Sequence, residues 1–211
     1  MSTKNQRVAK KCEGATKVKS ETMMSILRSN RESNWVRSSP RWWERYTEVV
    51  YERGHIEFLE RVFSATGVWK LAIVSPWIAS LENDPITVED IADYIARYHI
   101  KTLVIMRSPQ KEPTNAEAAE LFKRRIGSTL TLYYNNSVHA KIYVCRCQPF
   151  GFALLGSANL TPHKSRSYEV GLIINGFGAG EKIIEELELT ATDYIPGKGE
   201  SSLEWAPWYR R

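Results

Sequence analysis

The sequence predicts an α/β fold, in which helices flank a mixed β-sheet and a basic extension precedes the domain. Apolar β-rich runs alternate with helical patterns between residues 69 and 134, and the later runs follow one another directly. The chain has 211 residues, of which 43% are hydrophobic, so it can bury a sizeable core. We therefore expect an N-terminal extension over 1–38, one domain over 39–195 and a C-terminal tail over 196–211.

The first expected elements lie between residues 41 and 106. The stretch RWWERYTEVVYERGHIEFLERVF at 41–63 has a helical pattern that Gly54 interrupts. WKLAIVS at 69–75 predicts a strand that Pro76 ends. Residues 87–99 predict a helix, and KTLVIM at 101–106 predicts a second buried strand. In the helix, Thr87 and Asp90 have the spacing of a capping box.

The second half of the domain changes from alternation to consecutive strands. A helix is expected at 114–127, and strands are expected at 129–134, 139–145, 150–157 and 168–174. A last helix is expected at 181–190, whereas the Trp-rich end LEWAPWYRR has no assignment. Adjacent late strands after an alternating half indicate a mixed sheet.

The net charge of +5 is unevenly distributed along the chain. Residues 1–45 contain eleven Lys and Arg but only four Asp and Glu. A basic arm on a nearly neutral body is typical of proteins that bind polyanions. A solvated leader that aids solubility has the same composition, so charge alone leaves both interpretations open.

Other classes of protein fit the sequence less well. No apolar run approaches the roughly 18 residues that span a bilayer, and the first twenty residues lack the apolar core of a signal peptide. We expect a cytoplasmic protein without membrane contacts. Cys12, Cys145 and Cys147 cannot all pair, and no Cys or His cluster completes a zinc site, so neither a metal nor another cofactor is expected.

Five polar residues in the later strands form a candidate site. Because side chains alternate along a strand, His139 and Lys141 in VHAKIYV project from the same face. Ser157 and Asn159 follow in the turn GSAN. Glu169 lies in an apolar strand and needs a partner there. A carboxylate on one nitrogen of His139 would fix its tautomer and free the other nitrogen as a nucleophile, while Lys141 and Asn159 bind phosphate oxygens.

The pattern HAKIYV…GSANLT…SYEVGLII resembles the signature of the phospholipase D superfamily, in particular its nuclease-like branch. The resemblance implies a phospholipase D-like α/β sandwich. It further implies that the HxK histidine, His139, attacks phosphorus to form a phosphohistidine without any metal. A second histidine then protonates the leaving oxygen. The match is strong over 138–174 and looser upstream.

Two features set this chain apart from the family pattern. The fuller motif, HxKxxxxD, has an aspartate where this chain has Arg146. Only one HxK is present, since His55, His99 and His163 are not followed by a lysine two residues later. Because the family mechanism needs two histidines, the resemblance implies a homodimer in which His139 of both subunits faces one cleft.

The sequence therefore predicts a phosphodiesterase, specifically an endonuclease that cleaves DNA. The resemblance implies that it needs no metal and, by analogy with the family, that it is the nuclease component of a defence or restriction system with further subunits. Lys164 and Arg166 are candidates for contacts with the nucleic-acid backbone. A phospholipid-directed enzyme and a catalytically inactive nucleic-acid-binding member are the alternatives. For single residues, Ser157 and Asn159 can be turn formers, and Glu169 can pair with Arg166 instead of His139.

Overall fold

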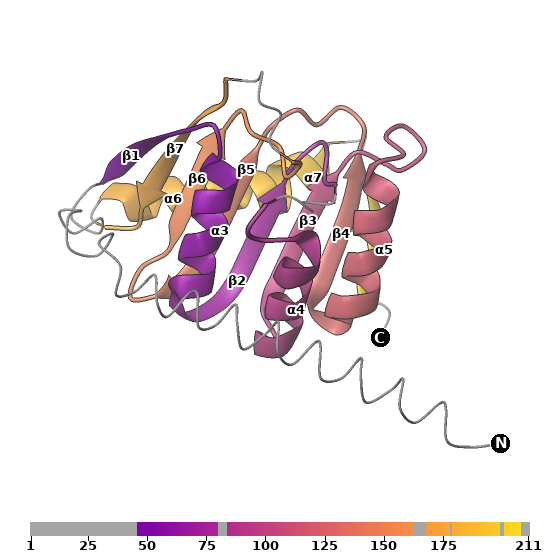
Figure 1. Ribbon diagram of the computed structural model, residues 1–211, viewed down its shortest axis with the longest axis horizontal. Coiled ribbons are helices and arrows are strands. Elements are labelled where there is room, and N and C mark those ends of the chain that lie inside the picture. Colours follow the sequence, from indigo (N-terminus) through magenta and orange to yellow (C-terminus); the bar gives the residue numbers. More distant parts are fainter. Residues whose placement is uncertain (1–45, 80–83, 163–167, 178, 199–200, 208–211) are drawn as a thin grey trace, which may run out of the picture. The chain divides into compact units, whose positions relative to one another are not determined.

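The computed structural model describes residues 46–79, 84–162, 168–177, 179–198 and 201–207 (Figure 1). The basic N-terminal segment and the loop that contains Lys164 and Arg166 lie outside the described residues. All described residues belong to the second of the two units into which the chain divides, Arg45–Arg211.

The described strands form one mixed sheet of eight strands in the order β1-β7-β6-β5-β2-β3-β4-β8. Strands β2, β3 and β4 are mutually parallel, and the other neighbouring pairs are antiparallel. The strands are β1 (Thr47–Tyr51), β2 (Thr66–Val74), β3 (Lys101–Met106), β4 (Leu130–Asn135), β5 (Ile142–Gln148), β6 (Phe152–Gly156), β7 (Val170–Asn175) and β8 (Ser201–Trp205). The predicted mixed α/β fold is confirmed.

Helices cover both faces of the sheet (Figure 1). Helices α3 (Gly54–Ser64), α4 (Val88–Tyr98) and α5 (Asn115–Ile126) pack on one face, where Phe58 and Phe122 are completely buried. Helix α6 (Ala179–Leu189) continues as a π-helical turn, Thr190–Tyr194, and as α7 (Ile195–Gly197). This run covers the second face and closes a smaller core around Ile184. A short 3-10 turn, Gly127–Thr129, follows α5.

Local sequence signals decide most of these elements. Thr87 and Asp90 form the predicted capping box at the start of α4, where each side chain bonds the other residue's backbone N–H. Strand β3 has the predicted limits of 101–106.

The helix predicted over 41–63 is wrong in its central part. Residues Thr47–Tyr51 form strand β1, which pairs with β7, and Gly54 is the first residue of α3. The run Val49-Val50-Tyr51 has β-branched and aromatic side chains that favour a strand. Pairing with β7 and burial of Val50 under α3 therefore outweigh the helical pattern.

The end of the chain joins the same sheet. Residues 201–205, assigned by sequence to a separate tail, form β8, which pairs with β4. Trp205 packs against the larger core and donates its indole N–H to the Gly127 carbonyl oxygen at 3.1 Å.

One edge of the sheet collects the ends that matter for function. Strands β2, β3, β4 and β6 end at this edge, and β5 and β7 begin there. Ligands of open α/β sheets bind outside the carboxyl ends of the parallel strands, where the strand order reverses. Here the reversal lies at β2, which has β3 on one side and β5 on the other.

Candidate active site

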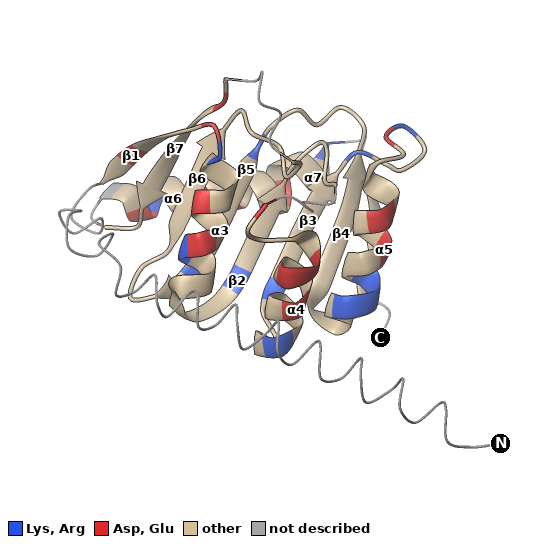
Figure 2. Cartoon of the chain, in the orientation of Figure 1, with Lys and Arg blue, Asp and Glu red and all other residues tan. Residues whose placement is uncertain are grey.

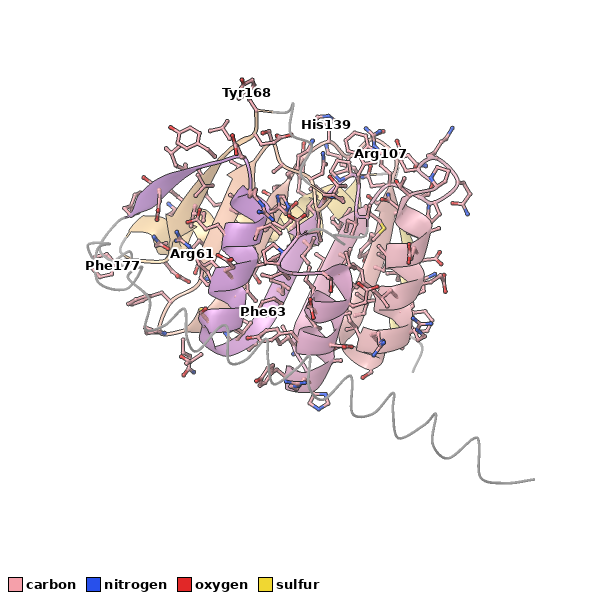
Figure 3. All side chains as sticks on the ribbon, viewed as in Figure 1. Arg61, Phe63, Arg107, His139, Tyr168 and Phe177 are labelled. Atoms are coloured by element: carbon pink, nitrogen blue, oxygen red, sulfur yellow. The ribbon has the colours of Figure 1, made fainter. Side chains whose placement is uncertain are left out.

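His139 lies on the loop between β4 and β5, at residues 136–141, and its side chain is exposed (Figure 3). Because β3 and β2 separate β4 from β5 in the sheet, this loop crosses their carboxyl ends. The predicted strand at 139–145 begins three residues later than expected, at Ile142. His139 therefore lies on a loop above the carboxyl end of β2, where the strand order of the sheet reverses.

Lys141 is almost completely buried beside His139, with 5% of its surface exposed. Its Nζ donates to the His139 carbonyl oxygen at 2.8 Å and lies 3.2 Å from Nδ1 of the imidazole. Burial lowers the pKa of Lys141, the charge of Glu169 raises it, and the charge of Arg107 lowers it. Within the described part of the chain, no carboxylate forms an ion pair with this ammonium group.

Ser157 and Glu169 meet where β6 ends and β7 begins. Ser157 Oγ donates to Glu169 Oε2, and the Ser157 backbone N–H donates to the Val170 carbonyl oxygen at 3.0 Å. Strands β6 and β7 approach closely here, since a Cβ at Gly156 would lie 3.0 Å from the Gly171 Cα. The sheet register therefore brings Ser157 and Glu169 together.

The partner of Glu169 differs from the one expected. Among the described residues, its carboxylate accepts from Ser157 rather than from His139. The physical reason is the register: Ser157, one residue beyond the last pair, Gly156–Gly171, lies opposite Val170 and bonds its backbone, so its hydroxyl reaches the neighbouring Glu169. Glu169 nevertheless acts on the site through space, because its charge opposes the lowering of the Lys141 pKa.

Asn159 lies on the segment after β6, which contacts the segment that follows β2. Leu160, next to it, forms a parallel bridge with Ile78, and its backbone N–H donates to Ser75 Oγ at 3.0 Å. The Oδ1 atom of Asn159 is buried and has no hydrogen-bond partner in the described structure. A buried acceptor without a partner is costly, which makes it a candidate contact for a ligand.

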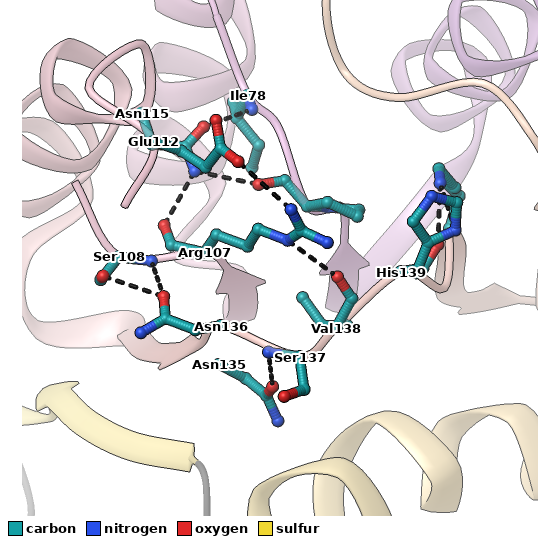
Figure 4. A network of polar contacts seen from close by, with 12 residues as sticks. Ile78, Arg107, Ser108, Glu112, Asn115, Asn135, Asn136, Ser137, Val138 and His139 are labelled. Carbon is teal, nitrogen blue, oxygen red and sulfur yellow. Dashed lines mark hydrogen bonds and ion pairs between the residues drawn. The ribbon is translucent and has the colours of Figure 1, made fainter. Parts of the chain in front are cut away.

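A polar network holds the loop that carries His139 (Figure 4). Arg107, directly after β3, donates from Nε to the Val138 carbonyl oxygen at 3.2 Å and pairs with Glu112. Ser108 donates from its backbone N–H and its hydroxyl to Asn136 Oδ1 at 3.0 and 2.9 Å. Because Asn136 and Val138 are both bonded to the segment that follows β3, the loop is held in place although it lies on the surface.

Asn115 joins the segments that leave β2 and β3. Its side chain is fully buried and accepts from the Ile78 backbone N–H at 2.8 Å. The same amide group donates to the carbonyl oxygens of Pro76 and Arg107 at 2.9 and 2.8 Å. This amide therefore sets the position of Trp77, which lies between Pro76 and Ile78.

The indole ring of Trp77 contacts the side chains of Arg107, Lys141 and His139. Cζ of Arg107 lies 4.7 Å and Nζ of Lys141 5.6 Å from the centroid of the Trp77 ring. The imidazole of His139 meets the same indole edge to face, with 6.0 Å between centroids.

Trp77, Arg107 and Asn115 belong to this site although they were not predicted from the sequence. From the sequence, Trp77 fits a core or dimer contact, or a base-stacking residue where it is exposed, and neither Arg107 nor Asn115 stands out. A usable signal was present for Trp77 and Arg107, since each follows the carboxyl end of a predicted parallel strand. Asn115 had no such signal, because its three backbone partners are brought together only by the fold.

Arg146, which replaces the family aspartate, lies on the other side of the sheet from this site. Its Nε lies 2.7 Å from Glu188 Oε2, and it also pairs with Glu181. Both carboxylates belong to α6. The side chain therefore anchors a helix and makes no contact with His139 or Lys141 among the described residues.

The remaining sequence predictions concern groups away from this edge. Cys145 and Cys147 are free and buried, and no cluster of three or more His, Cys, Asp and Glu side chains suited to a metal ion occurs in the described ranges. None of the described helices has the length and apolar character needed to cross a membrane. Lys164 and Arg166 fall outside the description.

Comparison with known proteins identifies likenesses of fold. No protein-family model and no curated sequence matches the chain. Among solved structures, polyphosphate kinase from Porphyromonas gingivalis aligns with a TM-score of 0.55 at 16% identity, over 80% of this chain and 29% of the other. At this identity the likeness shows a shared fold and nothing about activity.

Two further structures were found with lower scores. A phospholipase D family member, Nuc from Salmonella typhimurium, aligns at a TM-score of 0.49 and 13% identity, over 76% of this chain and 98% of that chain. Phosphatidylserine synthase from Haemophilus influenzae aligns at a TM-score of 0.47 and 14% identity, over 75% of this chain and 40% of that chain. A phospholipase D family member is therefore one of the structures that align with this chain. One fold hosts many functions, so the substrate must be argued from the site.

Proposed function

We propose that this protein is a metal-independent phosphodiesterase that cleaves DNA through a phosphohistidine on His139. One observation carries the proposal: an exposed imidazole lies beside a buried ammonium group that has no carboxylate partner among the described residues. A buried charge needs a counter-charge, and a substrate phosphate supplies it.

In this mechanism His139 attacks through the ring nitrogen that faces away from Lys141. The ammonium group 3.2 Å from Nδ1 favours a proton on the attacking nitrogen, which blocks attack in the absence of substrate. A bound phosphate draws the ammonium group towards its own oxygens. Nδ1 can then take a proton from water while the attacking nitrogen gives its own proton to water, and the nucleophilic nitrogen becomes free.

The reaction then proceeds in two balanced steps. A nitrogen–phosphorus bond forms, the bond to the leaving oxygen breaks, and a protonated second imidazole gives its proton to that oxygen. The second imidazole, now neutral, takes a proton from water, whose oxygen displaces His139 from phosphorus. Lys141 and Asn159 stabilise the phosphoryl oxygens in both steps.

The second imidazole comes from a second copy of the chain in this proposal. The exposure of His139 at the edge of the sheet supports this assignment, because a buried ring could not meet its equivalent in another subunit. A two-fold axis next to His139 brings the two rings to one phosphate. The basic N-terminal segment is compatible with DNA as the substrate, because Lys and Arg supply sequence-independent affinity for its phosphates. A role within a defence or restriction system stays a prediction.

The test is digestion of single- and double-stranded DNA in EDTA by the wild type and by His139→Ala. We expect cleavage in EDTA by the wild type, a loss of at least about 1,000-fold in the variant, and DNA affinity that is retained. Solution mass measured on the same samples reports the dimer. A strict requirement for magnesium would contradict the histidine mechanism, and full activity of a monomer would contradict the shared site.

Two outcomes would favour the other predicted functions. Hydrolysis of phospholipid vesicles without DNA cleavage indicates a lipid-directed enzyme. DNA binding without cleavage of any phosphodiester, unchanged in His139→Ala, indicates an inactive binding protein.

A further inference from the structure

A cleft of about 480 Å³ opens beside the proposed catalytic residues. Trp77, Asn159 and Glu169 belong both to its wall and to the site, whereas His139 and Lys141 are absent from the wall. The cleft therefore adjoins the position of the phosphate without containing it. It can hold a group that is covalently attached to that phosphate.

The wall of the cleft combines an aromatic ring with hydrogen-bond acceptors and with side chains that can also donate, namely His55, Thr114 and Thr161. Glu52 and Glu169 contribute carboxylates, and Asn159 contributes the buried Oδ1 that has no partner among the described residues. Two carboxylates repel a second phosphate, and acceptors need a ligand with N–H or O–H donors. Together with the indole of Trp77, this chemistry fits a flat, uncharged ring with donor groups, which is a nucleobase.

The surroundings of Trp77 disfavour a lipid head group with an ammonium charge. Such a group would bind the indole as a cation, but Arg107 and Lys141 already lie within 6 Å of the ring centroid. A further cation stacked on this ring meets two like charges, although Glu52 and Glu169 elsewhere on the wall would attract it. An uncharged base meets neither effect, and the vesicle measurement below separates the two ligands.

We propose that this cleft binds one unpaired nucleobase next to the cleaved phosphate. The inference rests on the proposed function and adds a substrate class to it, namely single-stranded DNA or a nucleotide extruded from a duplex. A paired base is stacked between its neighbours and cannot reach Trp77 without leaving the helix.

The experiment uses single-stranded oligonucleotides in which one phosphodiester lies among methylphosphonate linkages. An abasic residue is placed on either side of the cleavable bond. We expect the abasic substitution on one side to lower kcat/KM about 5- to 100-fold, the range for loss of one base–aromatic contact. We expect Trp77→Ala to cause a similar loss on the intact oligonucleotide and no further loss on that abasic one.

Trp69→Ala is the matched control, because this tryptophan is 52% exposed and lies in β2, on the side of the strand away from the end that Trp77 follows. It should leave both substrates unaffected. If Trp77 only positions Lys141 and His139, Trp77→Ala lowers cleavage of intact and abasic substrates by the same factor, which overturns the proposal. Equal cleavage of intact and abasic oligonucleotides by the wild type also overturns it, while the proposed function stands.

Failure of the proposed function has a separate signature. If the wild type cleaves no DNA in EDTA, equilibrium binding of the same oligonucleotides reports on the cleft. Weaker binding of the intact strand by Trp77→Ala, with unchanged binding of the abasic strand, supports the base site. Release of head groups from phosphatidylserine vesicles that depends on Trp77, without such a difference for DNA, overturns it.

Discussion

Lys141 and Arg146 lie at opposite ends of one segment and have opposite surroundings. Arg146, near the end of β5, is bound by Glu181 and Glu188 of α6, and Lys70 shares the second carboxylate. Lys141, directly before β5, is buried against His139 and Trp77 and has no ion pair among the described residues. The difference separates a cation that stabilises the fold from one that is available to an anion.

The same comparison applies to the basic last turn of α5, at the end of the sheet away from the site (Figure 2). Lys123 pairs with Glu120 and Glu204, and Arg125 pairs with Asp93. These two cations already have carboxylate partners, and the third, Arg124, is exposed to solvent rather than buried like Lys141. The cluster is therefore a weaker candidate for phosphate binding than Lys141, although it contains more charges.

Lys141→Met is expected to have the largest effect. The substitution keeps the length of the side chain and removes the charge, so kcat should fall by about 100- to 1,000-fold, as after loss of one transition-state donor. Because the lost charge is a desolvated one, the free energy of unfolding should stay the same or rise. Single-turnover cleavage and urea denaturation measure the two effects, and a destabilised but active variant would reverse our assignment.

Arg146→Met is the matched change at the other end of the segment. Removing both ion pairs leaves Glu188, whose side chain is only 14% exposed, with Lys70 alone, so we expect a loss of about 1–2 kcal/mol in the free energy of unfolding. Cleavage per folded molecule should be unchanged. A large fall in kcat at full stability would place Arg146 in the catalytic machinery.

The smallest expected effect is a shift in pH dependence. Lysine is charged below its pKa, and burial lowers the pKa of Lys141 from 10.5, so phosphate binding should weaken at a lower pH than for an ordinary lysine. The KM for DNA should rise on the alkaline side at that lower pH. Lys141→Arg should move this limb to higher pH because a guanidinium group stays charged, and Glu169→Gln should move it to lower pH. If KM rises at the same alkaline pH in the wild type and in both variants, a group other than Lys141 causes the rise.

The sequence alone determined the alternating strands and helices in the first half of the sheet. Apolar runs with β-branched residues set β2, β3 and β4, and the Thr87–Asp90 cap set the start of α4, because these signals act within a few residues. The spacing of His139, Lys141, Ser157, Asn159 and Glu169 also selected a group of residues that the fold gathers at one edge of the sheet.

Only the tertiary structure decided the partners of these residues. Strand β1 exists because β7 pairs with it, and Glu169 bonds Ser157 because of the β6–β7 register. Trp77 and Arg107 join the site because the loop from β4 crosses β3 and β2 before it reaches β5. Local propensity cannot encode these contacts, since each depends on which strands become neighbours in the sheet.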